Sequence, residues 1–202
     1  TGAGGMTGFV VVAAEHSEAE HIAFMARQAR GLVCLAMTPQ RCEELELPLM
    51  VEGDDSLSPF TLSIEAATGI DTGISAADRA RTVRVAVDAS SQASDLVQPG
   101  HIFPIAAALG GVLTRTAPAE AAMDLTTLAG LLPSAVFTEV LDNNGAVADA
   151  DDLAYFSALY PNPAELLGLA PDKLVYDAAD TDSLIEARKH RLGANLKLSY
   201  RK

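Results

Sequence analysis

The chain has few cysteines, few basic residues and no long apolar run. Only Cys34 and Cys42 occur among its 202 residues, and tryptophan is absent. Two cysteines are too few for the disulfide framework of a small secreted protein or for the ligand set of a zinc site, so both are predicted to be buried thiols. No segment approaches the roughly twenty apolar residues of a membrane span, and no basic region followed by an apolar one opens the chain. These absences predict a cytoplasmic protein without a membrane partner.

The charge balance is strongly acidic. With 27 acidic against 14 basic residues, the formal charge is -13. Such a charge repels nucleic acid, so no nucleic-acid partner is expected. An anionic substrate would need a local cluster of arginine, lysine or backbone N–H groups, which makes each of the few basic residues a candidate ligand.

The length and the hydrophobic share of 49% suit one domain with a sizeable core. Residues 1–5 read as an artificial leader before a native start at Met6, and residues 6–185 are expected to form the domain. Residues 186–202 form a basic C-terminal extension, for which a solvated terminal segment is the plain interpretation.

Helix and strand signals alternate along the chain. A helix is expected from the S-x-x-E capping box at 17–20 to Gly31, and further helices at 38–45, 75–87, 119–132 and 151–160. Strands are expected at 32–37, 60–65 and 136–141, and Asn143-Asn144-Gly145 is expected to form a turn. Residues 100–111 are too rich in glycine to assign. The spacing is not that of a doubly wound repeat, so a mixed-sheet α/β or α+β domain is predicted.

The densest polar segment is residues 71–79, where a glycine-containing turn with hydroxyls leads into a predicted helix. The free N–H groups and positive dipole end of a helix start suit a phosphate or a carboxylate. An ordinary capped helix, with Asp78 in its first turn, explains the same residues, and both interpretations remain open.

Three further side chains are candidates. His101 lies between glycine and apolar residues, and Arg115 follows the paired glycines 110–111 and could grip a phosphate through two hydrogen bonds. Glu139 lies in a predicted apolar strand, where a carboxylate is costly unless it is paired or functional. Each also has a plain explanation: a hydrogen-bonded structural histidine, a surface ion pair, and a carboxylate turned to solvent by strand alternation.

A series of motifs follows in order along residues 9–160. They are AAE at 13–15, GLVCLA at 31–36, LPLMV at 47–51, FT at 60–61 with IEA at 64–66, TGISAADR at 72–79, PGHIFP at 99–104, GGVL at 110–113, EAAMDL at 120–125 and LAG at 128–130. Several long motifs in the right order are far more specific than any single glycine pattern. Together they resemble the motifs of the 3,4-dihydroxy-2-butanone 4-phosphate synthase family.

The resemblance implies a single three-layer domain with a mixed twisted sheet flanked by helices. It also implies a homodimer with sites at the subunit interface, and a magnesium-dependent conversion of ribulose 5-phosphate to formate and a four-carbon phosphate used in riboflavin synthesis. The expected catalytic residues are Glu139, His101 and Asp78, and the expected substrate-binding residues are Arg115, Arg79, Thr72, Ser75 and Glu120.

Two departures fall on the metal ligands that the resemblance implies. The family's acidic loop, Asp-Arg-Glu-Asn-Glu-Gly-Asp, corresponds here to residues 4–9, which contain no carboxylate. The family's Arg-x-Gly-His-Thr-Glu reads here RTAPAE at 115–120, so that Pro118 and Ala119 replace the metal-binding histidine and a threonine. We therefore expect no metal cofactor, and no ordered divalent ion between Pro118 and residues 4–9.

Three functions remain open from the sequence. The first is a repurposed, metal-independent enzyme that acts on a small anionic or sugar-like substrate in a specialised biosynthetic pathway. The second is a genuine magnesium-dependent synthase of riboflavin biosynthesis, and the third is a non-catalytic ligand-binding homologue. We expect Arg115 and Glu139 to line one pocket, because Arg115 follows paired glycines that would let a ligand approach the backbone closely. Separate locations for the two side chains would favour the non-catalytic homologue.

Overall fold

A computed structural model of the chain describes residues 7–51, 59–159 and 176–177. The expected leader at 1–5 and the basic extension at 186–202 lie outside the described residues. Within them, no helix is long and apolar enough to cross a membrane.

The centre of the molecule is a six-stranded mixed sheet with strand order β3-β4-β2-β5-β1-β6. Strands β2 and β4 run parallel, and the other neighbouring pairs are antiparallel. The strands are β1 (Phe9–Ala13), β2 (Cys34–Met37), β3 (Ile64–Ala66), β4 (Leu96–Ala106), β5 (Ala135–Glu139) and β6 (Tyr176–Asp177).

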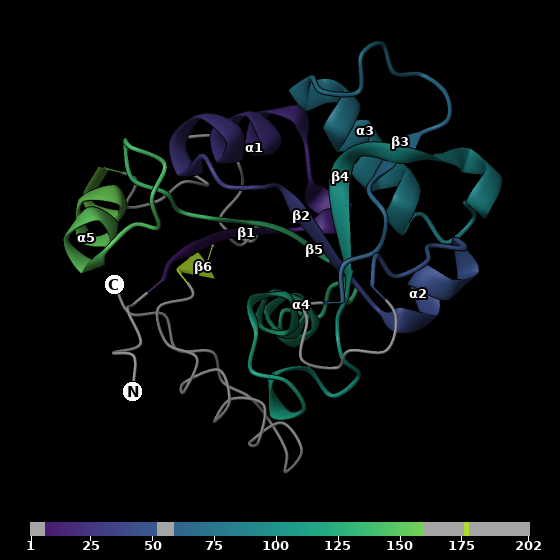
Figure 1. Cartoon of the computed structure of the whole chain (residues 1–202). Helices are drawn as coiled ribbons and strands as arrows, with labels where there is room; N and C mark the ends of the chain where they lie inside the picture. The colour runs from purple at the N-terminus through teal and green to yellow at the C-terminus, as the bar shows by residue number, and fades with distance from the viewer. Residues whose placement is uncertain (1–6, 52–58, 160–175, 178–202) are drawn as a thin grey trace.

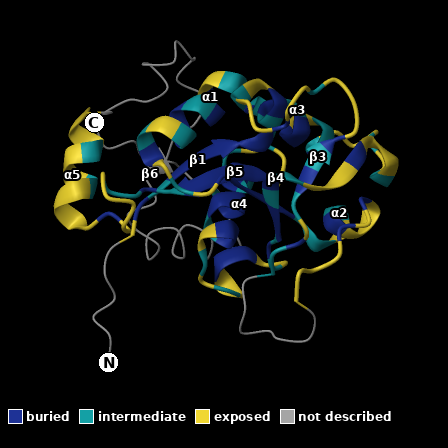
Figure 2. Ribbon diagram, turned by 45° about the horizontal axis from the view of Figure 1, so that its top comes forward, coloured by how far each residue is buried: buried dark blue, intermediate teal, exposed yellow. Residues whose placement is uncertain are grey.

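Helices cover both faces of this sheet, as Figure 1 shows. One face carries α1 (Ala19–Phe24) and α3 (Ala76–Val87), and the other carries α4 (Pro118–Leu128). Figure 2 shows buried residues concentrated in the sheet and on the inner side of α4, while α5 (Ala150–Leu159) is largely exposed. The expected fold, a single α/β domain with a mixed sheet flanked by helices, is confirmed.

The first helix begins and ends one residue away from the expected positions. Glu18, rather than Ser17, is the N-cap, and its side chain and that of His21 form the capping box. After α1 the chain continues as a π-helical turn, Met25–Ala29, which Arg30 ends in the left-handed region with φ 69°. Gly31 does not end the helix. It allows the chain to pass close to β5, because a Cβ there would lie 2.2 Å from the carbonyl oxygen of Glu139.

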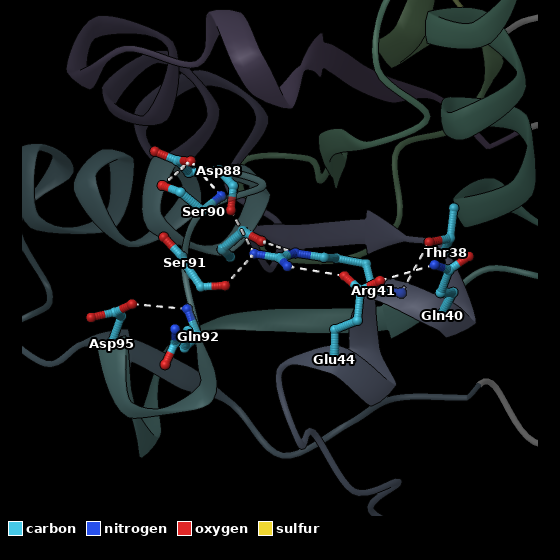
Figure 3. Close-up of polar contacts among 10 residues, drawn as sticks. Thr38, Gln40, Arg41, Glu44, Asp88, Ser90, Ser91, Gln92 and Asp95 are labelled. Carbon is cyan, nitrogen blue, oxygen red and sulfur yellow. Dashed lines mark hydrogen bonds and ion pairs between the residues drawn. The ribbon is translucent and has the colours of Figure 1, made fainter.

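The helix α2 (Pro39–Glu44) begins as the sequence predicts, with Thr38 as N-cap and Pro39 in the first turn. Its Arg41 connects it to the C-terminal end of α3 (Figure 3). The Arg41 guanidinium donates to the carbonyl oxygens of Ala86, Asp88 and Ser91 at 3.0, 2.6 and 3.2 Å. A cation at a helix C-terminus satisfies carbonyls that have no intrahelical partner, so this contact fixes α2 against α3.

The segment left unassigned in the sequence forms part of the longest strand, β4. Pro99, Gly100 and Pro104 lie within it, although prolines argue against a central strand because they cannot donate to the ladder. Pro104 still accepts, because its carbonyl oxygen receives the N–H of Thr61 at 3.0 Å. The strand expected at 60–65 is shorter than predicted and is preceded by isolated bridges at Phe60 and Thr61.

Candidate active site

Strand register brings His101 and Glu139 to the same end of one sheet face. Cys34 on β2 is in register with Phe103 on β4 and with Phe137 on β5, and all three side chains lie on the α4 side. His101 comes two residues before Phe103 on a parallel strand, and Glu139 comes two residues after Phe137 on an antiparallel one. Both therefore share the face and the end of the sheet. One strand, β2, lies between the two strands that carry them.

The turn before α3 is held by its own helix. Ser75 is the N-cap, and its hydroxyl accepts the N–H of Asp78 at 3.0 Å. The Asp78 carboxylate accepts the N–H of Gly73 at 3.0 Å and that of Asp71 at 3.4 Å. Burial opposes ionisation, but the hydrogen bonds from Ser75 and from the backbone of 71–73 outweigh it and hold the pKa of Asp78 below its ordinary value. This is the capped-helix arrangement, and it places Asp78 in a structural contact.

Thr72 and Arg79, the other candidates from this segment, differ in surroundings. Thr72 is exposed on the turn. Arg79 is half-buried, its Nε has no hydrogen-bond partner among the described residues, and burial lowers the pKa of its guanidinium.

His101 is paired with a carboxylate that the sequence interpretation did not select. Its Nδ1 contacts Oε1 of Glu65 on the neighbouring strand β3. The register between β3 and β4 shifts at this point, with Ile64 opposite Ile102 but Glu65 opposite Val97. In the sequence, Glu65 stands in an alternating strand and in the IEA motif at 64–66, but nothing there marked it as a site residue.

Arg115 and Glu120 form a separate group at the first turn of α4. The guanidinium of Arg115 contacts Oε1 of Glu120, whose side chain is fully buried, and donates to the carbonyl oxygen of Ala106 at 3.3 Å. The N–H of Ala108 donates to the same Glu120 oxygen at 2.7 Å. One turn further along the helix, Asp124 accepts the N–H of Val112 at 2.9 Å. Two buried carboxylates of α4 thus hold the loop that follows β4.

The structure therefore sorts the predicted residues into three groups: His101 and Glu139 at one end of the sheet, Thr72, Ser75, Asp78 and Arg79 at the start of α3, and Arg115 and Glu120 at the start of α4. In the part of the chain that the structure describes, no hydrogen bond or ion pair connects Arg115 with His101 or Glu139. A single pocket shared by Arg115 and Glu139 stays a prediction.

A cavity of about 190 Å³ lies between the start of β1 and the start of α4. Phe9 and Val11 line it from the strand, and Thr116, Ala117 and Pro118 line it from the helix start. It lies against the same segment of β1 that pairs with Glu139. The lining is apolar apart from hydroxyl groups, so it suits the carbon skeleton of a ligand better than a charge.

The fold and this site define an α/β protein with a candidate acid–base site on one face of a mixed sheet. Known proteins specify the class further. A family model described as 3,4-dihydroxy-2-butanone 4-phosphate synthase matches residues 5–161. The chain belongs to this family.

Relatives that carry the family name are similar over most of this chain. The synthase of Pseudomonas aeruginosa is 51% identical over 153 residues, covering 75% of this chain and 42% of its own length. That of Pseudomonas syringae pv. tomato is 50% identical over 152 residues, covering 74% and 41%. The chain thus spans about two fifths of the length of these relatives.

Solved structures agree with the fold. A two-domain 3,4-dihydroxy-2-butanone 4-phosphate synthase from A. baumannii superposes with a TM-score of 0.71 at 45% identity, covering 81% of this chain and 47% of that one. A 3,4-dihydroxy-2-butanone 4-phosphate synthase in complex with two magnesium ions gives a TM-score of 0.71 at 31% identity, covering 82% and 87%.

The expectation of a protein without a metal cofactor was wrong. It rested on two short segments, 4–9 and 115–120, whereas the relative solved with two magnesium ions shares the fold over 82% of this chain. The departure of individual residues from the family's motif is weaker evidence than similarity over a whole domain, because other oxygen ligands can hold a hard cation.

Proposed function

We propose that the chain is a magnesium-dependent synthase that converts ribulose 5-phosphate to 3,4-dihydroxy-2-butanone 4-phosphate and formate. The observation that carries this proposal is the identity of 50 and 51% to relatives named as this synthase. A repurposed enzyme in another pathway finds no support in these similarities. No specific feature of the structure favours a non-catalytic binding protein.

The reaction combines enolisation, a shift of the carbon skeleton and loss of formate. Enolisation needs a base for a proton on carbon and a group that stabilises charge on the neighbouring oxygen. Later steps need an acid that returns protons. A site for this chemistry therefore needs at least two acid–base groups within the span of a five-carbon substrate.

His101 and Glu139 supply such a pair in the proposal. They lie on the same face and at the same end of the sheet, on strands that β2 separates, so side chains that converge on a substrate between them would contact different carbons. His101 acts as the base and Glu139 as the second acid–base group. In the proposal, Asp78, Ser75 and Thr72 do not take part in proton transfer. They maintain the shape of the turn before α3.

Arg115 is the proposed phosphate ligand. One guanidinium nitrogen is held by Glu120 and Ala106, and its side chain keeps 30% of its surface exposed. A guanidinium fixed at one nitrogen and open at another is oriented for an anion before the anion arrives. Glu120, fully buried, therefore orients the arginine in this proposal and does not itself contact substrate. Arg79 is a second cation near the turn.

Magnesium, when bound, would polarise substrate oxygens and stabilise the charge that enolisation places on them. Among residues 7–51, 59–159 and 176–177, no group of three or more His, Cys, Asp or Glu side chains is placed to hold an ion. No residue is therefore assigned as a magnesium ligand.

We also propose a homodimer, because the resemblance implies sites at a subunit interface and, among the described residues, no hydrogen bond or ion pair connects Arg115 with His101 or Glu139. Light scattering at tens of micromolar should give twice the chain mass of 21.0 kDa. A monomer at that concentration would contradict it. A cytoplasmic location stays a prediction.

Binding is tested by thermal unfolding with ribulose 5-phosphate, ribose 5-phosphate and inorganic phosphate, each with and without magnesium. A ligand that binds only the native state raises the melting temperature. The proposal predicts the largest rise for ribulose 5-phosphate with magnesium. An equal rise with phosphate alone would show an anion site without recognition of the sugar.

A further inference from the structure

The carboxylate of Glu65 is fixed in place by features on three sides. Its side chain is 15% exposed and contacts Nδ1 of His101, whose side chain is 43% exposed. A Cβ on Gly73 would lie 1.8 Å from its Oε1. A Cβ on Gly100 would lie 2.1 Å from the backbone carbonyl of Ile64 and 2.5 Å from the Cγ of Glu65. A side chain at Gly73 would therefore displace the Glu65 carboxylate, and one at Gly100 would first displace the backbone of β3 that carries it.

The turn that carries Gly73 is itself held by the Asp78 carboxylate of α3. Gly73 has a φ of 77°, a conformation that favours glycine, and its N–H donates to the buried Asp78 carboxylate. Asp78 thus holds Gly73, and Gly73 confines Glu65 toward His101. The register shift between β3 and β4 at Ile64 and Glu65 has the same effect, because such irregularities re-aim side chains.

From this arrangement we infer that Glu65 is a positioning residue that acts through His101. This inference rests on the proposed function for its catalytic consequence. A carboxylate only accepts hydrogen bonds, so Nδ1 of the neutral imidazole carries the proton and Nε2 keeps its lone pair. In the enolisation step, Nε2 takes the proton from the substrate carbon. The electrons of the broken C–H bond form the carbon–carbon double bond, and those of the carbonyl π bond move to its oxygen.

Glu65 was not among the site residues expected from the sequence. It lies 36 residues from His101, in a strand where a polar residue is ordinary. Only the pairing of β3 with β4 brings the two side chains together. Gly73 leaves room for the Glu65 carboxylate, and Gly100 leaves room for the backbone of Ile64 beside it.

The test combines a spectroscopic and a kinetic measurement on the full chain with Glu65→Gln, and with exposed Glu43→Gln as the matched control. In ¹⁵N-histidine-labelled protein at neutral pH, His101, assigned by its loss in His101→Gln, should show a protonated Nδ1 and an unprotonated Nε2. Glu65→Gln should shift the population toward the other tautomer, because the glutamine amide can also donate. Glu43→Gln should leave the spectrum unchanged.

In turnover, Glu65→Gln should lower kcat on the order of a hundredfold, as expected for a misoriented general base, with KM within about twofold. Glu65→Asp should recover part of kcat. A His101 tautomer that does not respond to Glu65→Gln would overturn the inference. A raised KM with kcat unchanged in Glu65→Gln would also overturn it. If the native chain shows no turnover, the proposed function fails while the tautomer measurement still decides whether Glu65 orients His101.

Discussion

The guanidinium of Arg115 is ion-paired with the carboxylate of Glu120, a side chain from which solvent is fully excluded. The same carboxylate accepts the backbone N–H of Ala108. The pair therefore fixes both the proposed phosphate ligand and the loop after β4. Substitution of Arg115 should weaken substrate binding, whereas substitution of Glu120 should lower the stability of the fold, because only Arg115 is proposed to contact the substrate.

Arg115→Ala should raise the KM for ribulose 5-phosphate about tenfold to a hundredfold, since a charge-assisted hydrogen bond contributes roughly 1.5 to 3 kcal/mol. Arg84→Ala is the matched control, because Arg84 forms an exposed pair with Glu18 and should leave KM unchanged. Steady-state kinetics at saturating magnesium provide the measurement. An unchanged KM in Arg115→Ala would remove this residue from the site.

Glu120→Ala should lower the free energy of unfolding by about 3 kcal/mol, because it leaves the arginine and the Ala108 N–H without their buried partner. Glu44→Ala removes an exposed partner of Arg41 and should change stability little. Urea unfolding at pH 7 compares the two. A loss below about 1 kcal/mol for Glu120→Ala would mean that the pair is not a structural support.

Gly73→Ala and Gly145→Ala separate backbone strain from the displacement of Glu65. Both glycines have positive φ, 77° and 83°, but a Cβ on Gly145 meets nothing within 4 Å. Gly145→Ala should lower stability by about 1 kcal/mol and leave turnover unchanged. Gly73→Ala should also lower kcat more than tenfold. Equal kinetics in the two variants would show that the contact with Glu65 does not matter for activity.

The hydrogen-bonded Asp78 predicts a loss of stability in acid. Its pKa is lower in the folded chain than in the unfolded one, so its contribution is fully present above the unfolded value of about 3.9 and is lost as pH falls through the folded value. The stability difference between the native chain and Asp78→Asn should therefore be constant from about pH 5 to 8 and shrink below about pH 4. Urea unfolding across this range checks it. A stability difference that grows as the pH falls would mean that the pKa of Asp78 is raised in the folded chain, and would contradict the prediction.

Both thiols should be inert in the native chain. Burial raises the pKa of Cys34 to about 12 and, against a smaller effect of Arg41, that of Cys42 to about 11. The predicted buried free thiols are confirmed. At pH 8 an aromatic disulfide reagent should react at least a hundredfold more slowly with the native chain than with the chain in guanidinium, because the thiolate is the reactive form. Rapid labelling of the native chain would show that either thiol is accessible.

The sequence predicted those elements whose signals are local. Thr38-Pro39 and Ser75 carry their own capping chemistry, and α2 and α3 begin there. The strand β4 could not be predicted, because its glycine and prolines are poor strand formers and its place is fixed by pairing with β2 and β3. The same limit applies to the end of the first helix, where Arg30 adopts positive φ so that Gly31 can pass close to β5.

The candidate site divides in the same way. His101, Asp78, Arg115 and Glu120 were recognisable from motifs in the sequence. Glu65 stands in a motif too, but its pairing with His101 became recognisable only through the contact between strands. The expected absence of magnesium was wrong because it weighed two short segments above the similarity of the whole domain.

Release of formate from ribulose 5-phosphate tests the proposed activity most directly. The full chain, assayed with an enzyme-coupled formate measurement, should release formate in the presence of millimolar magnesium. Release should stop with excess chelator and return when magnesium is restored. No formate with magnesium present, from a chain shown to be folded, would contradict the proposed synthase, and release that persists in chelator would contradict its dependence on magnesium.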